Sequence, residues 1–330
     1  MSVLITGGAG YIGSHMVWEL LDAREEVVVL DRLSTGFEWA VAPEAKLVVG
    51  DIADSELVAK VIREHRVDAV IHFAGSVVVP ESVSDPLAYY ENNTCKTRSL
   101  IETVVRTGVQ HFIFSSTAAI YGVTGLEPVG EDAPLSPESP YGASKLMSEW
   151  MLRDASLAHA FRYTALRYFN VAGADPAGRT GQSTAGATHL IKTAVETALG
   201  KRPYINIYGT DYPTPDGTCV RDYIHVADLV AAHRLALNRL RAGGASLTAN
   251  CGYGVGHSVR EVIEAVRRSW GKDFDVRDAA RRPGDAAAVV ADAALARQEL
   301  GWVPRHDDLA RIVSDALSWE EKLAVKNSVR

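Results

Sequence analysis

A tyrosine and a lysine four residues apart form the pattern with the clearest potential for proton transfer. Tyr141 and Lys145 follow Pro137 and Pro140 at the start of a predicted helix, where residues i and i+4 share one face. The ammonium would favour the phenolate, and lowering a tyrosine pKa by about three units from about 10 requires roughly 4 kcal/mol. The hydroxyl groups of segment 115–117 end a predicted strand and would assist such a base. The pattern indicates acid–base chemistry, although Y-x-x-x-K alone also occurs on ordinary surface helices.

Three glycines near the amino terminus have the spacing of a phosphate-binding turn. Gly7, Gly10 and Gly13 lie between an apolar run at 3–5, which predicts a strand, and an amphipathic pattern at 14–23, which predicts a helix. Glycine lets the backbone approach a pyrophosphate, and the helix N-terminus adds N–H groups and the positive end of its dipole. A glycine triplet also occurs in ordinary tight turns. Its position between a strand and a helix favours a dinucleotide site.

Acidic residues end the next two predicted strands and bear on the choice of cofactor. Asp31 would accept hydrogen bonds from the adenosine ribose diol, and its charge would repel a 2′-phosphate. This favours NAD over NADP, although Arg32 beside it would accommodate that phosphate. Asp51 and Ile52 end the third strand and are placed to meet the adenine, with a polar strand end as the alternative. The nicotinamide of NAD would also bring a positive charge to the tyrosine.

The elements that must position these residues alternate between apolar runs and amphipathic helices. The predicted strands are 3–5, 27–30, 47–49, 69–73, 112–114 and 164–168. Continuous apolar runs separated by amphipathic helices indicate a parallel sheet that is covered on both faces. We therefore predict an α/β fold with a Rossmann-type, doubly wound parallel sheet.

The second half of the chain differs in local amino-acid composition, because Gly, Pro, Thr and Asp cluster there. We predict an NAD-binding Rossmann domain at 1–172 and a smaller C-terminal α/β substrate-binding region at 173–330. Two segments of the second half, 221–226 and 247–250, are expected to return to the first sheet. Segments near 220–250 would therefore belong to the first domain.

Composition excludes several classes of protein. The chain has 330 residues and a net charge of −7, which argues against non-specific binding to nucleic acid or an anionic membrane. Its three cysteines are isolated and no metal-ligand spacing occurs, so neither a disulfide framework nor a metal site is expected. The chain does not begin with a leader pattern, and no uncharged apolar run is long enough to span a bilayer. We expect a cytoplasmic protein.

The chain as a whole resembles the extended short-chain dehydrogenase/reductase family, and within it the UDP-glucose 4-epimerases (UDP-galactose 4-epimerases). The resemblance is carried by segments 7–15, 72–75, 89–93, 115–122, 139–145, 167–170, 208–226 and 282–285, with 212–226 the most specific. It implies NAD, a UDP-hexose and a transient 4-keto sugar. Tyr141 would act as acid and base at C4, Lys145 would tune it, and Thr117 would hydrogen-bond the reacting oxygen. It also implies a homodimer joined through helices around 86–107 and 144–158.

The resemblance, together with the motifs above, assigns residues to two ligands. The predicted cofactor contacts are Gly7, Gly10, Tyr11, Ile12, Gly13, Asp31, Asp51, Ile52, Phe73, Ala74, Gly75, Asn92, Ser115, Tyr141, Lys145 and Tyr168. The predicted substrate contacts are Thr117, Tyr141, Asn170, His189, Leu190, Tyr208, Arg221, Arg282, Asp285 and Val289. Arg221 and Arg282 suit a pyrophosphate because guanidinium groups bind such oxygens in pairs, and ion pairing with Asp222 or Asp285 is the alternative.

The chain departs from the family pattern at three positions. Val77 stands where the family usually has a lysine that reaches the nicotinamide ribose, which would weaken NAD retention. His189 replaces an asparagine near UDP, and it either binds the nucleotide or merely ends a helix. Val289 replaces a bulky tyrosine of some members, which leaves room for N-acetylated or pentose sugars.

Three other functions are alternatives to an epimerase. A nucleotide-sugar dehydratase would carry an acidic pair after Thr117, where this chain has Ala118 and Ala119. A non-catalytic NAD-sensing protein would have no reason to keep Thr117, Tyr141 and Lys145 together. An oxidoreductase that releases NADH remains an alternative.

Overall fold

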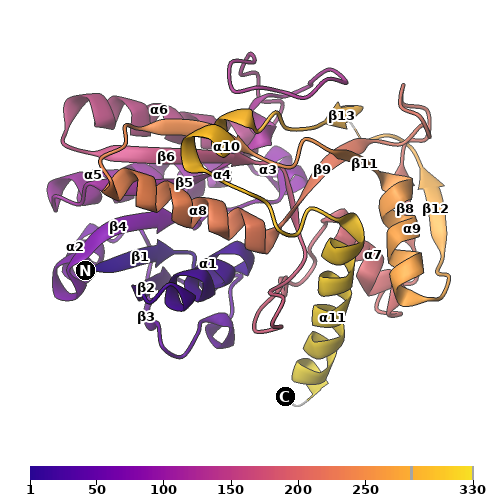
Figure 1. Cartoon of the computed structure of the whole chain (residues 1–330), viewed down its shortest axis with the longest axis horizontal. Coiled ribbons are helices and arrows are strands. Elements are labelled where there is room, and N and C mark those ends of the chain that lie inside the picture. The colour runs from indigo at the N-terminus through magenta and orange to yellow at the C-terminus, as the bar shows by residue number, and fades with distance from the viewer. Residues whose placement is uncertain (283–284, 329–330) are drawn as a thin grey trace.

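A seven-stranded parallel sheet forms the centre of the protein (Figure 1). The computed structural model describes residues 1–282 and 285–328. The strand order is β10-β6-β5-β4-β1-β2-β3. The strands are β1 (Ser2–Thr6), β2 (Glu26–Asp31), β3 (Lys46–Val49), β4 (Val67–His72), β5 (His111–Thr117), β6 (Arg162–Tyr168) and β10 (Leu247–Cys251). The predicted α/β, doubly wound architecture is confirmed.

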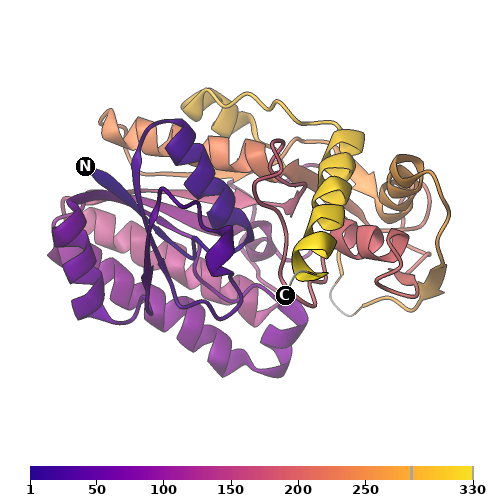
Figure 2. The ribbon, with the colours of Figure 1, turned by 90° about the horizontal axis from the view of Figure 1, so that it is seen from below.

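Helices cover both faces of this sheet, as Figure 2 shows from below. One layer contains α1 (Tyr11–Asp22), α8 (Val226–Arg241) and α10 (Ala294–Leu300), and the other contains α2 (Ser55–His65), α5 (Lys96–Arg106) and α6 (Pro140–Ala158). Alternate strand residues face opposite layers, so Val3 and Ile5 pack in one buried cluster and Leu4 in the other. Burial on both sides explains why the strands are continuous apolar runs.

Short elements connect the strands near their carboxyl ends. They are the 3₁₀ turns η1 (Glu38–Ala40) and η3 (Ala118–Ile120), the helices α3 (Val79–Ser84) and α4 (Pro86–Tyr89), and a π-helix, η2 (Tyr90–Cys95). The π-helix runs directly into α5, so a wider turn interrupts what would otherwise be one regular helix. Single π turns of this kind are frequent at functional sites.

The smaller region contains two further sheets. β7 (Asn170–Ala172), β11 (Gly256–Ser258) and β13 (Ala288–Val289) all belong to a four-stranded sheet with β9 (Val220–His225), and β8 (Ile205–Tyr208) pairs with β12 (Val276–Ala279). The helices of this region are α7 (Leu190–Ala198), α9 (Val259–Trp270) and α11 (Leu309–Ser328). One buried cluster extends from the first sheet into this region, where Ile191 and Val262 belong to it. The two parts therefore share a hydrophobic core.

Of the two segments expected to return to the first sheet, one joins it and the other does not. Segment 247–250 does so, because β10 lies parallel to β6 at the sheet edge. The expectation for 221–226 is wrong, since β9 pairs with β7, β11 and β13 instead. The sequence of a strand carries no local signal for its partner strand. The chain returns to the first sheet only through the next helix, α8, which packs on α1 and β6.

The strand order places a cleft at the carboxyl ends of the sheet. The order reverses between β1 and β4, and open α/β sheets bind ligands at such a switch point. A cleft of about 680 Å³ lies there, within the range of ligand sites. It extends from the glycine turn after β1 across β4 and β5 to the smaller region.

Candidate active site

The glycine turn forms one end of the cleft, and all five residues predicted there line it. Gly7 has φ of 73°, and a Cβ on it would lie 2.6 Å from the backbone nitrogen of Ala74. A Cβ on Gly13 would lie 2.1 Å from the Gly7 oxygen, so this glycine lets α1 approach the turn. Tyr11, Ile12 and Gly13 begin α1, where N–H groups have no acceptor within the helix. This backbone fits the pyrophosphate of a dinucleotide.

Asp31 holds the glycine turn in place. Its Oδ2 accepts from the N–H of Ala9 at 2.9 Å, and its Oδ1 accepts from the N–H of Leu33 at 2.8 Å. Each carboxylate oxygen has capacity for a second hydrogen bond, which a ribose diol can supply. Arg32 also lines the cleft, and its Nε donates to Ser34 Oγ at 3.0 Å. Arg32 is therefore already engaged by a neighbour, which favours NAD over NADP at this end.

Asp51 and Ile52, the residues predicted to meet the adenine, line the cleft. Lys96 Nζ donates to Asp51 Oδ2 at 2.5 Å, and the guanidinium of Arg32 lies 3.7 Å from the same oxygen. Burial opposes ionisation here, but the hydrogen bond from Lys96 holds the pKa of Asp51 below its usual value. Asp51 is thus an anion with one oxygen occupied by a lysine.

The predicted catalytic side chains lie together at the centre of the cleft. Ser139 caps α6 by accepting from the Gly142 N–H at 3.2 Å, so Tyr141 lies in the first turn. Thr117, the last residue of β5, hydrogen-bonds the Tyr141 side chain. Lys145 donates from Nζ to the Ser115 carbonyl at 2.9 Å. A phenol, a hydroxyl and an ammonium therefore meet in one partly enclosed place.

Burial dominates the electrostatics of this group in the protein alone. Burial raises the pKa of Tyr141 above its ordinary value, and the Thr117 hydrogen bond offsets only part of this rise. Burial also lowers the pKa of Lys145 to about 8. The sequence prediction assigned the lowering of the tyrosine pKa to the lysine together with the positive charge of NAD, and that combined effect stays a prediction. The ammonium is turned toward Ser115.

The remaining predicted cofactor residues line the cleft between the glycine turn and Tyr141. They are Phe73, Ala74, Gly75, Asn92, Ser115 and Tyr168. Ser115 Oγ and Tyr168 OH are hydrogen-bonded, which joins the ends of β5 and β6. Val77 also lines the cleft and is 51% exposed, so an apolar side chain occupies the position where the family usually has a lysine.

Asn93, which was not predicted from the sequence, lies behind these cleft-lining residues. It is buried in the π-helix η2, and its amide accepts from Ser76 N at 2.7 Å and donates to Ser76 O at 2.9 Å. It also donates to Ser144 Oγ on α6 at 3.2 Å. Asn92 instead reaches the cleft and donates to Ser76 Oγ. The Asn-Asn pair signals a polar position, but the π turn that separates the two roles has no local signature.

Most predicted substrate residues line the other end of the cleft. Asn170, His189, Arg221, Asp285 and Val289 lie there together with Thr117 and Tyr141. Arg221 Nη2 is 3.5 Å from Asp285 Oδ1, so the ion-pair alternative for this arginine is also present. Asp222 is not the partner, because it is buried and accepts N–H groups of Tyr253 and Gly254.

Arg282 and Tyr208 do not line this cleft. The Arg282 guanidinium lies over the Tyr208 ring, 3.8 Å from its centre, and the arginine is exposed. The two side chains thus make a cation–π contact with each other at the edge of β8. Pro283 and Gly284, the middle of motif 282–285, lie outside the described residues.

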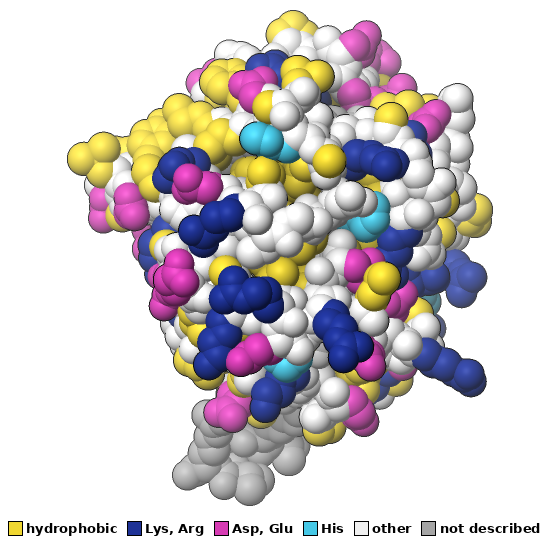
Figure 3. Space-filling model, turned by 90° about the vertical axis from the view of Figure 1, so that its left-hand side faces the viewer, with side chains coloured by type: hydrophobic (Ala, Val, Ile, Leu, Met, Phe, Trp, Pro, Cys, Tyr) yellow, Lys and Arg dark blue, Asp and Glu magenta, His cyan; other side chains and the backbone are white. Residues whose placement is uncertain are grey.

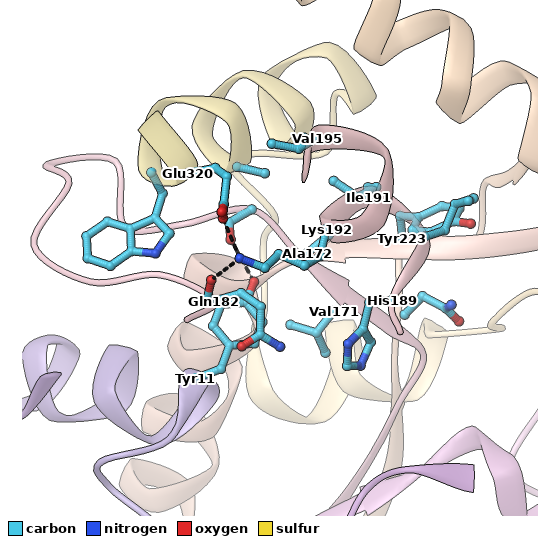
Figure 4. A pocket seen from close by; sticks show the side chains of 15 residues that line it. Tyr11, Val171, Ala172, Gln182, His189, Ile191, Lys192, Val195, Tyr223 and Glu320 are labelled. Atoms are coloured by element: carbon cyan, nitrogen blue, oxygen red, sulfur yellow. Dashed lines mark hydrogen bonds and ion pairs between the residues drawn. The ribbon is translucent and has the colours of Figure 1, made fainter. Parts of the chain in front are cut away.

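Leu190 lines a small annex of the cleft, shown in Figure 4. The annex measures about 30 Å³, which holds one or two water molecules and no nucleotide. Lys192 points into it, donates to Gln182 O at 3.1 Å and pairs with Glu320 of α11. His189 is the N-cap residue of α7, makes no side-chain capping bond and borders both the cleft and the annex. Its position is compatible with nucleotide binding.

Within residues 1–282 and 285–328, no group of three or more His, Cys, Asp or Glu side chains could hold a metal ion. No helix in that part of the chain is both long and apolar enough to cross a membrane.

Comparison with known proteins gives consistent matches along the chain. Residues 3–252 match the family described as NAD dependent epimerase/dehydratase. The chain is 58% identical to a UDP-glucose 4-epimerase of Azospirillum brasilense over 97% of this chain and 92% of that one. The UDP-glucose 4-epimerase of Brucella ovis, solved in complex with NAD, is 44% identical with a TM-score of 0.94, covering 96% and 97%. The UDP-Glc/GlcNAc 4-epimerase of Campylobacter jejuni is 47% identical with a TM-score of 0.85, covering 97% and 99%.

Proposed function

The chain belongs to the NAD dependent epimerase/dehydratase family, and we propose that it inverts C4 of a UDP-hexose and so interconverts UDP-glucose and UDP-galactose. The observation that carries this proposal is the grouping of Thr117, Tyr141 and Lys145 in a cleft that runs from the glycine turn to Arg221. One end suits a dinucleotide and the other a second anionic nucleotide. The enzyme is an NAD-dependent isomerase, and the cofactor is NAD.

The residues of the cleft fit NAD. Side chains at Gly7 and Gly13 would collide with backbone, the first turn of α1 presents N–H groups, and Asp31 can accept from a ribose. When bound, NAD supplies a hydride acceptor that takes the C4 hydrogen and returns it to the opposite face of the sugar, together with a positive charge that favours the phenolate.

Side chains of the protein remove and return the proton of the C4 hydroxyl. Tyr141 Oη removes the proton of the C4 hydroxyl and later returns it, which is the role of a general acid–base group. Thr117 hydrogen-bonds the reacting oxygen, since its hydroxyl already bonds the Tyr141 side chain. Lys145 stabilises the phenolate by its charge. Burial excludes water, which strengthens these interactions and protects the oxidised sugar.

The nucleotide is held while the sugar turns. Arg221 lies in the cleft, where its guanidinium can exchange Asp285 for a pyrophosphate oxygen. His189 and Leu190 mark the N-terminus of α7, whose N–H groups suit the same phosphates. Arg282 and Tyr208 would join them only after their stacked pair separates. A firmly anchored UDP leaves the hexose free to present either face.

Val289 supports a second substrate class, UDP-N-acetylglucosamine or a UDP-pentose. This side chain lines the cleft and is half-buried, and it is smaller than a tyrosine. Space there would accept an acetamido group. A dehydratase is disfavoured, because Ala118 and Ala119 offer no acid or base after Thr117.

Segments 1–172 and 173–330 are proposed to contact different ligands. The cofactor contacts proposed above come from the first segment, with α8 and β10 returning to complete its sheet. The proposed UDP contacts come from the second segment, apart from Asn170, Thr117 and Tyr141. The shared core makes these regions functional rather than independently folding units.

A homodimer through α4, α5 and α6 is supported by exposed apolar side chains. Leu87, Trp150 and Leu157 are 77%, 46% and 82% exposed, and the last two lie seven residues apart on α6. Large exposed apolar side chains on adjacent elements are typical of an interface. Figure 3 views the end of the molecule at which the strands begin, where one upper edge is mainly hydrophobic while charges of both signs are interspersed elsewhere.

The free thiols of Cys95, Cys219 and Cys251 suit the reducing cytoplasm, where we place the enzyme.

The direct test is incubation of the purified protein with UDP-galactose without added reductant. We expect UDP-glucose to form until equilibrium, with no net change in NADH absorbance. Accumulation of free NADH in proportion to substrate would instead identify a dehydrogenase. The same assay across UDP-hexoses, UDP-N-acetylhexosamines and UDP-pentoses would rank the two substrate classes.

A further inference from the structure

A buried ion pair lies directly behind the catalytic group. Glu149 follows Tyr141 by eight residues and Lys145 by four, so all three lie on the same face of α6. Glu149 and its partner Arg167 are each only 5% exposed. Arg167 Nη2 donates to Glu149 Oε2 at 2.7 Å and Nε donates to Oε1 at 3.1 Å, which gives a two-point contact.

This carboxylate completes a three-point attachment between α6 and the end of β5. Lys145 donates to the Ser115 carbonyl, Ser116 Oγ donates to Glu149 Oε1, and Thr117 bonds Tyr141. Three consecutive strand residues are thus each bonded to α6. The middle bond is made by Glu149.

Arg167 extends the attachment to the turn that follows Thr117. It lies opposite Ser116 on the neighbouring strand β6, and its Nη1 donates to Tyr121 OH at 3.0 Å. Tyr121 OH in turn donates to Asn250 Oδ1 on β10 at 2.6 Å. Because Tyr121 ends the turn η3, Thr117 is held both before and after its position.

We propose that the Glu149–Arg167 pair is a positioning device for the reaction, which fixes Thr117 and Lys145 beside Tyr141 and, being neutral as a pair, adds no net charge there. The inference rests on the proposed function. Stability alone does not explain two buried charges, because apolar residues of similar size are often equally stabilising in such places. A two-point guanidinium–carboxylate contact does fix an orientation, which an apolar contact would not.

The charges around Tyr141 make this inference testable through acid–base behaviour. The titratable groups near it are Tyr168 on β6 and Tyr89 on α4, which bonds Glu81 on α3, and His72 on β4 lies near Lys145. Glu149 lies two helical turns further along α6 and is paired with Arg167 on β6. Burial lowers the pKa of His72 to about 3, so it is neutral. Loss of the Glu149 charge leaves Arg167 uncompensated and lowers the Tyr141 pKa, whereas loss of the Arg167 charge raises it. Over about 12 Å of helix each shift amounts to about one pH unit.

The experiment compares Glu149→Gln, Arg167→Met and the double variant, each with and without Tyr141→Phe. The difference in phenolate absorbance between paired proteins reports the titration of Tyr141 and requires no turnover. Steady-state kinetics with UDP-galactose give kcat and KM across pH. Asp68→Asn is the matched control, because it breaks the half-buried Asp68–Arg241 pair at the other end of β4.

We expect opposite shifts of about one pH unit in the two single variants and a return to within about 0.3 unit in the double variant. Each single variant should lose at least about tenfold in kcat with KM changed less than about threefold, since a small misplacement suffices. The double variant should remain slow, because it has lost the two-point guanidinium–carboxylate contact and the Arg167 bond to Tyr121. Asp68→Asn should leave the titration and kcat unchanged even where it lowers the unfolding midpoint.

Two results would overturn the inference. One is an unchanged Tyr141 titration in both single variants, and the other is full kcat in the double variant. If a single variant does not fold, the charge-neutral double variant still decides through its kcat. If the parent epimerises no UDP-sugar, the proposed function fails separately, and the titrations still report the effect of the pair.

Discussion

Replacing Lys145 with methionine should stabilise the fold while abolishing turnover. The ammonium is 4% exposed, and burial lowers its pKa from 10.5 to about 8. This difference costs the folded state roughly 3 kcal/mol at neutral pH. Lys145→Met removes that cost but also loses the bond to the Ser115 carbonyl and the contact with the Phe114 ring at 5.0 Å, together about 1–2 kcal/mol. We expect a net gain of about 1–2 kcal/mol at pH 7.

The pH dependence follows from proton binding by the two states. Between about pH 8 and 10.5 the unfolded parent binds more protons than the folded parent, so the parent gains stability as pH rises through this window. Below pH 8 the full cost remains. The advantage of Lys145→Met should therefore be constant from pH 7 to 8, then decline by about 1.4 kcal/mol per unit and vanish between about pH 9 and 10.

Urea unfolding at pH 7, 8, 9 and 10 would measure this advantage, with kcat for UDP-galactose determined in parallel. Lys60→Met is the matched control, because the Lys60 side chain is 64% exposed and its loss should leave the pH dependence unchanged. A pH-independent difference between parent and Lys145→Met, or a variant less stable at pH 7, would refute the account of burial. Retention of near-normal kcat would refute the role of the ammonium in supporting Tyr141.

Three further changes test separate parts of the proposal. Tyr141→Phe should lower kcat by about 10²–10⁴-fold while leaving UDP affinity by calorimetry within about twofold, and a near-normal rate would exclude this phenol as the acid–base group. Val289→Tyr should lower kcat/KM for UDP-N-acetylglucosamine at least about tenfold and for UDP-galactose less than about threefold, because the ring fills space beside C2. Unchanged acetylated-sugar activity would remove the steric argument. Leu157→Arg, at a position 82% exposed on α6, should convert a dimer to monomers in light scattering by placing a charge in an apolar contact, and a monomeric parent would contradict the interface.

Elements with a strong local signal were predicted from the sequence. The apolar runs 3–5 and 27–30 are buried on both faces of the sheet and contain the residues expected in strands. The predicted start of the helix at Tyr141 is close, because Pro140 and Ser139 are typical of a helix N-terminus. The glycine turn lies between a strand and a helix as predicted. In each case short-range sterics and hydrogen bonding determine the outcome.

Features that depend on distant partners were not predicted. The sequence of strand β9 does not specify its partner strands, and its neighbours β7 and β13 place it in the second sheet. Asn93 and Asn92 are chemically identical, yet a π turn buries one and leaves the other in the cleft. Tyr141 and Lys145 both line the cleft, but their pKa directions depend on how completely the folded chain excludes water.

Net charge gives little information about this cleft, although both expected ligands are anions. The carboxylates that line it are already engaged: Asp31 accepts two backbone N–H groups, Asp51 binds Lys96, Glu81 accepts from Tyr89 OH, and Asp285 lies beside Arg221. Their charges are therefore partly compensated where a phosphate would approach. The N-terminus of α1 and the guanidinium of Arg221 then supply the local positive potential. A protein with a net charge of −7 can thus bind two pyrophosphates, because potential within a low-dielectric cleft depends on nearby dipoles and ion pairs rather than on the whole-chain sum.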